Sequence, residues 1–134
     1  RQGVSNIWKV GNTVIDSLLY CYEKVRKNTS QYDRKYAFLG SFEKLVLITG
    51  HRRENFGAGF EHICQAVELL SARYPNFLFL YPVHLNPNVR GIVFDRLGTI
   101  SNIKLIDPVG YDELVYLMSR SLKILMEMAN QLNI

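Results

Sequence analysis

Residues able to bind an anion gather in one short segment. Residues 50–59 hold one imidazole, two guanidiniums and three glycines, and a helix is expected to start close behind them. A helix N-terminus favours anions, guanidiniums bind phosphate oxygens in bidentate fashion, and His51 could protonate a phosphate leaving group. This pattern predicts phosphate recognition. The alternative is structural, with His51 packed at a strand end and the arginines paired with Glu54 and Glu61.

A second histidine lies in a proline-rich loop. His84 stands between Pro82 and Pro87, which fix the backbone, and it follows an apolar run that is typical of a strand. If the two strands are neighbours, His84 lies near residues 50–59. The spacing alone favours a capping or core histidine over a ligand-binding one. His62 is expected to face solvent and is assigned no role.

A third loop, residues 107–111, could receive a flat ring against Tyr111 and offer backbone groups to a base. The alternative, favoured on spacing alone, is a turn in which Asp107 caps the next helix. Asp107, Asp112 and Glu113 do not form an acid/base pair by spacing, so no complete hydrolytic site is visible. The residues by themselves support an anionic-ligand site and nothing more specific.

These loops need a parallel sheet to bring them together. Short apolar runs alternate with segments of helical periodicity, which predicts an α/β, Rossmann-like parallel sheet with helices on both faces. Ligands of such sheets bind beyond the carboxyl ends of the strands, where the three loops lie. We expect strands at 45–48, 77–81, 103–106 and 122–125, helices at 12–27, 60–70, 88–97 and 111–118, and a connector at 28–41.

Composition excludes several other classes of protein. The 134 residues suit one domain, and 48% hydrophobic with 21% charged residues is ordinary for a folded chain. The net charge of +4 arises in residues 1–40, which is weak evidence for nucleic-acid binding. Apolar runs such as 77–83 are too short to cross a bilayer, so we expect a cytoplasmic protein. Cys21 and Cys64 lack the spacing of a disulfide framework or zinc site.

No cofactor is expected either, because the glycines at 57 and 59 lack the third glycine and the downstream acid of a dinucleotide fingerprint.

Two motifs in register carry a resemblance. Residues 50–55 and 81–90 closely resemble the non-hydrolysing UDP-N-acetylglucosamine 2-epimerases, and the similarity runs from residues 11–16 to about Leu125. The resemblance implies a two-domain, glycosyltransferase-B-like fold with the active site in the cleft. It also implies interconversion of UDP-GlcNAc and UDP-ManNAc, through elimination of UDP and its re-addition with C2 inverted.

The resemblance also assigns roles to individual residues. His51 would be catalytic, stabilising or protonating the departing UDP near the diphosphate. Arg52, Glu54 and His84 match residues that would contact a second UDP-GlcNAc, which activates bacterial members allosterically. The segment from Tyr111 to Leu114 would lie close to the uracil. The family also tends to form homodimers.

The same resemblance divides the chain. Residues 1–43 would be an interdomain helix and linker, and residues 44–134 an incomplete C-terminal UDP-binding domain. The family's N-terminal domain and a later Asp-Ser-Gly-Gly motif are not matched, and the sequence starts at Arg1 without Met, so we expect a fragment that is inactive alone. The alternatives are a non-catalytic sugar-nucleotide-binding or regulatory fragment, and generic nucleic-acid binding through the basic N-terminal third.

Overall fold

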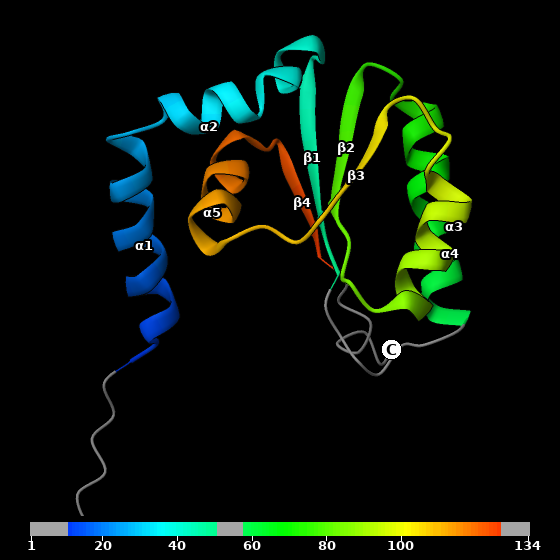
Figure 1. Cartoon of the computed structure of the whole chain (residues 1–134), viewed down its shortest axis with the longest axis horizontal. Coiled ribbons are helices and arrows are strands. Elements are labelled where there is room, and N and C mark those ends of the chain that lie inside the picture. Colours follow the sequence, from blue (N-terminus) through cyan, green and yellow to red (C-terminus); the bar gives the residue numbers. More distant parts are fainter. Residues whose placement is uncertain (1–10, 51–57, 127–134) are drawn as a thin grey trace, which may run out of the picture.

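The computed structural model describes residues 11–50 and 58–126 (Figure 1). Helices and strands alternate after an N-terminal helical segment. The helices are α1 (Thr13–Arg26), α2 (Ser30–Lys35), a 3-10 helix (Ala37–Ser41), α3 (Ala58–Arg73), α4 (Pro87–Leu97) and α5 (Tyr111–Arg120), and the strands are β1 (Lys44–Thr49), β2 (Phe77–Pro82), β3 (Ile103–Ile106) and β4 (Lys123–Met126).

The four strands form one sheet in the order β3-β2-β1-β4, and every neighbouring pair is parallel. The two inner strands are almost wholly apolar because both of their faces are covered. Along β1, Val46 and Ile48 belong to one buried cluster and Leu45 and Leu47 to the other. The predicted α/β, Rossmann-like class and its four strands are confirmed.

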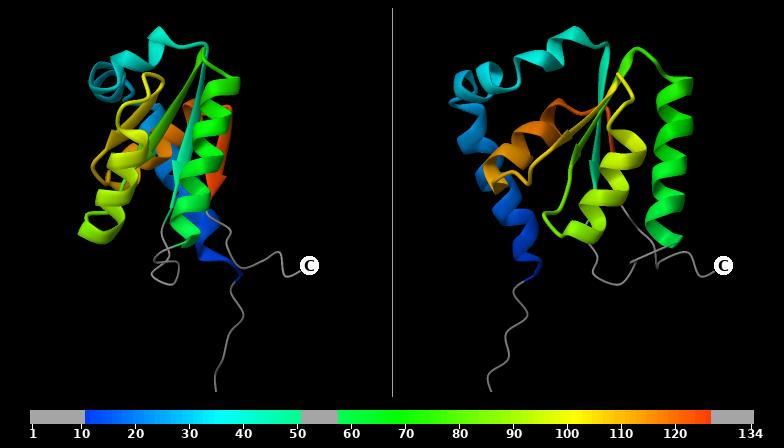
Figure 2. Two further views of the ribbon diagram at one scale, coloured as in Figure 1. Left: turned by 90° about the vertical axis from the view of Figure 1, so that its right-hand side faces the viewer. Right: turned by 45° about the vertical axis from the view of Figure 1, so that its right-hand side comes forward.

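Two helical layers cover the sheet (Figures 1 and 2). On one face, α3 and α4 bury Cys64, Val93 and Leu97 against the sheet. On the other face, α5 buries Val115 and Leu117, while α1 packs against α5. The crossover helices that follow β1 and β2 therefore lie on one face of the sheet, and the helix that follows β3 lies on the opposite face.

The connector expected at residues 28–41 is instead helical. It contains α2 and the 3-10 helix, and Tyr32 and Tyr36 are buried there with 7% and 4% of their surface exposed. Their rings stack on Tyr116 of α5, with centroids 5.2 and 5.8 Å away. The four-residue spacing places both rings on one side of the chain, and burial of aromatic surface offsets the weak helical propensity of the segment.

The helix starts are set by local side chains in two cases. Asn12 caps α1, its Oδ1 accepting the N–H of Val14 at 3.1 Å. Asn86 caps α4 in the same way. The expectation that Asp107 caps α5 is wrong, because the N-cap residue is Gly110, without a side-chain cap, and Asp107 pairs elsewhere.

Cys21 on α1 and Cys64 on α3 are both buried thiols, on opposite sides of the sheet. Within residues 11–50 and 58–126, His, Cys, Asp and Glu side chains form no group of three or more that could hold a metal ion. Over the same residues, no helix combines the length and apolar content needed to cross a membrane.

Candidate functional site

A hollow of about 160 Å³ opens at the carboxyl ends of the three strands β1, β2 and β3. We call it the strand-end pocket. This volume is below the roughly 300–1,000 Å³ of sites that enclose a drug-sized ligand, so the pocket can enclose only part of such a ligand. Its lining is mostly apolar with an imidazole at the rim, and consists of Ile48, Thr49, Gly50, Pro82, His84, Pro108, Val109 and Leu114.

This pocket lies beside a topological switch point of the strand order. From β1 the chain builds outward to β2 and β3 on one side, and β4 then returns to pair with the other side of β1. Thr49, at the end of β1, pairs with Met126 at the end of β4. Open α/β sheets bind ligands in the crevice at such a reversal.

His84 is exposed and lies at the pocket rim, so it is not a core residue. Its Nδ1 accepts the backbone N–H of Asn86, the N-cap residue of α4, at 3.1 Å. Because Nδ1 accepts this bond, the neutral imidazole carries its proton on Nε2. The local contact with Asn86 therefore sets both the ring position and its tautomer.

Leu114 and Tyr111 lie on different sides of the first turn of α5. Leu114 lines the strand-end pocket. Tyr111 is half exposed and lines a second hollow, of about 490 Å³, between α5 and α1. That second hollow is completed by Asp16, Ser17, Tyr20, Cys21 and Lys24. The structure thus brings His84 and Leu114 together and places Tyr111 in the neighbouring hollow.

The first turn of α5 is tied to α2. The Tyr32 hydroxyl donates to Oδ2 of Asp112 at 2.7 Å, and Lys35 forms an ion pair with Glu113. The bond from Tyr32 holds the pKa of the Asp112 carboxyl below its usual value and raises the pKa of the Tyr32 phenol. These contacts fix the end of α5 from which Leu114 reaches the pocket.

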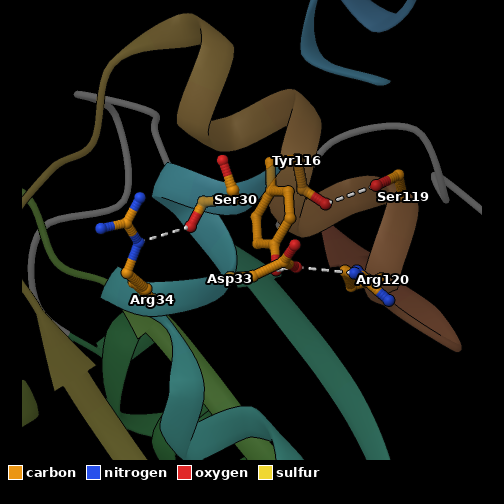
Figure 3. Close-up of polar contacts among 6 residues, drawn as sticks. All are labelled: Ser30, Asp33, Arg34, Tyr116, Ser119 and Arg120. Carbon is orange, nitrogen blue, oxygen red and sulfur yellow. Dashed lines mark hydrogen bonds and ion pairs between the residues drawn. The ribbon is translucent and has the colours of Figure 1, made fainter. Parts of the chain in front are cut away.

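The second half of α5 is held by the same helix (Figure 3). Oδ1 of Asp33 accepts hydrogen bonds from the Tyr116 hydroxyl at 2.8 Å and from Arg120 at 2.7 Å. The bond from Tyr116 is the main cause that lowers the pKa of Asp33, while burial, followed by the bond to Asp33, raises the pKa of Tyr116. Figure 3 shows these three side chains converging between α2 and α5.

The other predicted site residues lie outside the described part of the chain. His51, Arg52 and Glu54 belong to residues 51–57, so their geometry is not described. Gly50, immediately before them, does line the strand-end pocket. Their predicted roles stay predictions.

The sequence interpretation missed the polar contacts from α2. Tyr32, Asp33 and Lys35 all come from the segment interpreted as a connector. The available signal was the spacing of Tyr32, Tyr36 and Leu39, which repeats at four and three residues as on one face of a helix.

A parallel sheet covered on both faces, with a hollow at its strand ends beside the strand-order reversal, defines a Rossmann-like α/β unit. The sequence model described as UDP-N-acetylglucosamine 2-epimerase matches residues 1–127. This chain belongs to the UDP-N-acetylglucosamine 2-epimerase family.

Individual relatives agree with the family match. The UDP-N-acetylglucosamine 2-epimerase of Campylobacter jejuni is 45% identical over 121 residues, which cover 86% of this chain and 32% of the relative. The Neisseria meningitidis enzyme, solved bound to UDP-GlcNAc, has 44% identity and a TM-score of 0.81 over 87% of this chain and 32% of its own. The Methanocaldococcus jannaschii enzyme, solved with UDP-GlcNAc and UDP, has 27% identity and a TM-score of 0.70 over 93% of this chain and 35% of its own.

The chain thus spans about a third of the length of the curated relatives that it matches.

Proposed function

We propose that this chain forms part of the UDP-binding half of an enzyme that interconverts UDP-GlcNAc and UDP-ManNAc. The observation that carries the proposal is the strand-end pocket, bordered by His84 and Leu114, in a chain of the epimerase family. A pocket of about 160 Å³ suits one portion of a nucleotide sugar, with further contacts made by other segments.

The proposed chemistry is elimination of UDP from C1 together with the C2 proton, followed by re-addition of UDP to C1 and of a proton to the opposite face of C2, which inverts C2. His51 would act as the catalytic residue that stabilises or protonates the leaving UDP, because an imidazole near a diphosphate can donate a proton at neutral pH. Arg52 would hold phosphate oxygens as a bidentate donor. These roles rest on the family match, which includes residues 51–54.

His84, Arg52 and Glu54 would contact a second UDP-GlcNAc beside the substrate, as an allosteric activator. The position of His84 at the pocket rim supports a contact with a nucleotide sugar. Leu114 and the first turn of α5 would border the uracil. Tyr111, which lines the neighbouring hollow, would contribute to that border through its backbone.

Titration of the isotope-labelled 134-residue chain with UDP, then with UDP-GlcNAc, tests this proposal by NMR. We expect saturable shifts of the amides of Gly50, His84 and Val109, which line the strand-end pocket. His84→Ala should weaken binding, whereas His62→Ala should not, because His62 is an exposed imidazole on α3. A dispersed spectrum with no shifts at the pocket would contradict the proposal.

Turnover is measured separately, by assaying UDP-ManNAc formation. We expect binding without turnover, since relatives about three times longer carry the activity named for them. Normal turnover by this chain would show that its own residues complete the site and would overturn the assignment of missing catalytic groups to other segments.

We also propose a cytoplasmic location and a homodimer. In the described sheet, β3 and β4 are the outer strands, and unpaired strand edges favour association. Analytical ultracentrifugation of the chain over a range of concentrations measures the oligomeric state, and a monomer throughout would contradict the dimer.

A further inference from the structure

Two loops that border the strand-end pocket leave the sheet in opposite directions. Pro82 and His84 lead into α4, whereas Pro108 and Val109 lead into α5, on the other face of the sheet. The backbone N–H of Val83 donates to the Ile106 carbonyl at 2.9 Å, just before the two loops diverge. Beyond this last bond, the separation of the two loops, and with it the width of the pocket, depends on a contact between the loops or the helices that follow them.

An ion pair supplies that contact. Nη1 of Arg90, on α4, donates to Oδ1 of Asp107 at 2.7 Å, and Asp107 directly precedes Pro108. The Arg90 guanidinium carbon also lies 4.7 Å from the centroid of the Phe94 ring, one turn further along α4. This cation–π contact orients the guanidinium toward the loop after β3.

Arg90 is connected to His84 as well. The Arg90 backbone N–H donates to the Asn86 carbonyl at 2.9 Å, and the Asn86 N–H donates to Nδ1 of His84 at 3.1 Å. A continuous series of hydrogen bonds thus runs from the pocket residue His84, through Asn86 and Arg90, to Asp107 beside the pocket residue Pro108.

We infer that Arg90 is a positioning residue, which sets the separation of the His84 and Pro108–Val109 sides of the pocket and thereby tunes nucleotide affinity. The affinity part of this inference rests on the proposed function. The Arg90 and Asp107 side chains are 39% and 71% exposed, and ion pairs this exposed add little to stability. Its position between the two pocket loops is what gives this pair a function.

The same helix offers a matched control. Arg96 pairs with Glu68 of α3 at 3.7 Å, with 35% and 33% of the two side chains exposed. This pair joins the two helices that cover one face, and neither residue lines the strand-end pocket. Arg96→Gln removes a comparable charge from α4 without touching either pocket loop.

The first measurement needs no ligand. In Arg90→Gln and in Asp107→Asn, the amide signals of His84 and Val109 should both shift, whereas Arg96→Gln should leave them unchanged. Arg90→Lys, which keeps the positive charge but loses the planar guanidinium beside Phe94, should restore the original shifts only in part. If Arg90→Gln alters only amides within α4, Arg90 does not connect the two loops and the inference is wrong.

The second measurement is the UDP affinity of the same variants. Arg90→Gln and Asp107→Asn should each weaken binding by about five-fold, and the double variant should be no weaker than either, because each single change breaks the same contact. Equal affinity of Arg90→Gln and the unchanged chain would overturn the inference. If the unchanged chain does not bind UDP, the proposed function and the tuning of affinity are both contradicted. The amide shifts measured without ligand decide separately whether Arg90 connects the two loops.

Discussion

The hydroxyl group of Tyr116 donates a hydrogen bond of 2.8 Å to Oδ1 of Asp33, which joins the middle of α5 to α2. The same carboxylate oxygen accepts a bond from Arg120, and the Tyr116 ring stacks on Tyr32. Since the first turn of α5 contributes Leu114 to the strand-end pocket, α2 indirectly fixes one side of the pocket. A segment without site residues of its own thus supports the site.

Tyr116→Phe should lower the free energy of unfolding by about 1 kcal/mol, because it removes the hydrogen bond to Asp33 and keeps the buried ring. Urea unfolding measures the change. Tyr20→Phe is the control, since Tyr20 is 77% exposed and its substitution should have no effect. Equal stability of both variants would mean that water replaces Asp33 at no cost.

Acid should weaken the attachment of α2 to α5. Hydrogen bonds from tyrosine hydroxyls hold the pKa values of Asp33 and Asp112 below the ordinary 3.8. A carboxyl with a depressed folded-state pKa contributes stability that is fully present above its unfolded-state pKa and is lost as pH falls through the folded-state value. The urea concentration at the unfolding midpoint should therefore decrease when the pH is lowered below about 4. The decrease should be smaller in Asp33→Asn. An identical acid profile in that variant would rule out Asp33 as a contributor.

Tyr36→Phe should stabilise the protein at neutral pH by about 1 kcal/mol. The Tyr36 hydroxyl is buried without a hydrogen-bond partner among the described residues, and burial, followed by the nearby charge of Glu113, raises its pKa to about 12 from 10.0. The folded state favours the neutral phenol, so ionisation of Tyr36 in the unfolded chain leaves stability unchanged below pH 10 and lowers it as pH rises toward 12.

Alkaline unfolding, followed by circular dichroism, should accordingly be less steep in Tyr36→Phe than in the unchanged chain. Tyr22→Phe, which alters a more exposed ring, serves as the control. A loss of stability in Tyr36→Phe at neutral pH would show that the hydroxyl has a partner in solution.

Asn102→Asp should be strongly destabilising at neutral pH. The Asn102 amide is buried, and its Nδ2 donates to the carbonyls of Ser71, Tyr74 and Phe77 at 3.0 to 3.2 Å. A carboxylate there would face acceptors only, at a cost of about 3 kcal/mol or more. Protonation restores one donor, so the deficit relative to the unchanged chain should shrink in acid. Asn88→Asp, at an exposed position, is the control.

Leu47→Ala should cost about 2–5 kcal/mol, because Leu47 is fully buried in β1, between β2 and β4. Leu69→Ala removes the same atoms from a side chain on α3 that is 73% exposed, and should change stability little. Chemical denaturation of the two variants gives the comparison. Similar losses in both would contradict the assignment of β1 as the centre of the core.

The elements with strong periodicity could be predicted from the sequence. The runs at 45–48 and 103–106 fall within β1 and β3, and the helix predicted at 88–97 begins one residue after the observed start of α4. Unbroken apolar runs identify strands buried on both faces, and Asn12 identifies a helix start through its own hydrogen bond to the backbone. These signals are local, so no knowledge of tertiary contacts is needed.

Features that depend on distant partners could not be predicted in the same way. Tyr32 and Tyr36 are buried against α5, some eighty residues later, where both rings stack on Tyr116. Asp107 does not cap α5 because the helix begins later, with Gly110 at the N-cap, and the Asp107 carboxylate pairs with Arg90 of α4. Proximity of His84 and Leu114 follows from the strand order, while His51, Arg52 and Glu54 stay predictions.

The two buried clusters also differ in when their parts leave the ribosome. The cluster beneath α3 and α4 draws on residues from Val46 to Ile103, a continuous stretch that can close as soon as it is synthesised. The cluster under α5 includes Cys21 and Val25 of α1, which must wait for Leu117 before their partners exist. Since contacts between distant segments form slowly, we expect the α3–α4 half of the domain to fold during translation and α1 to dock later, once α5 has been synthesised.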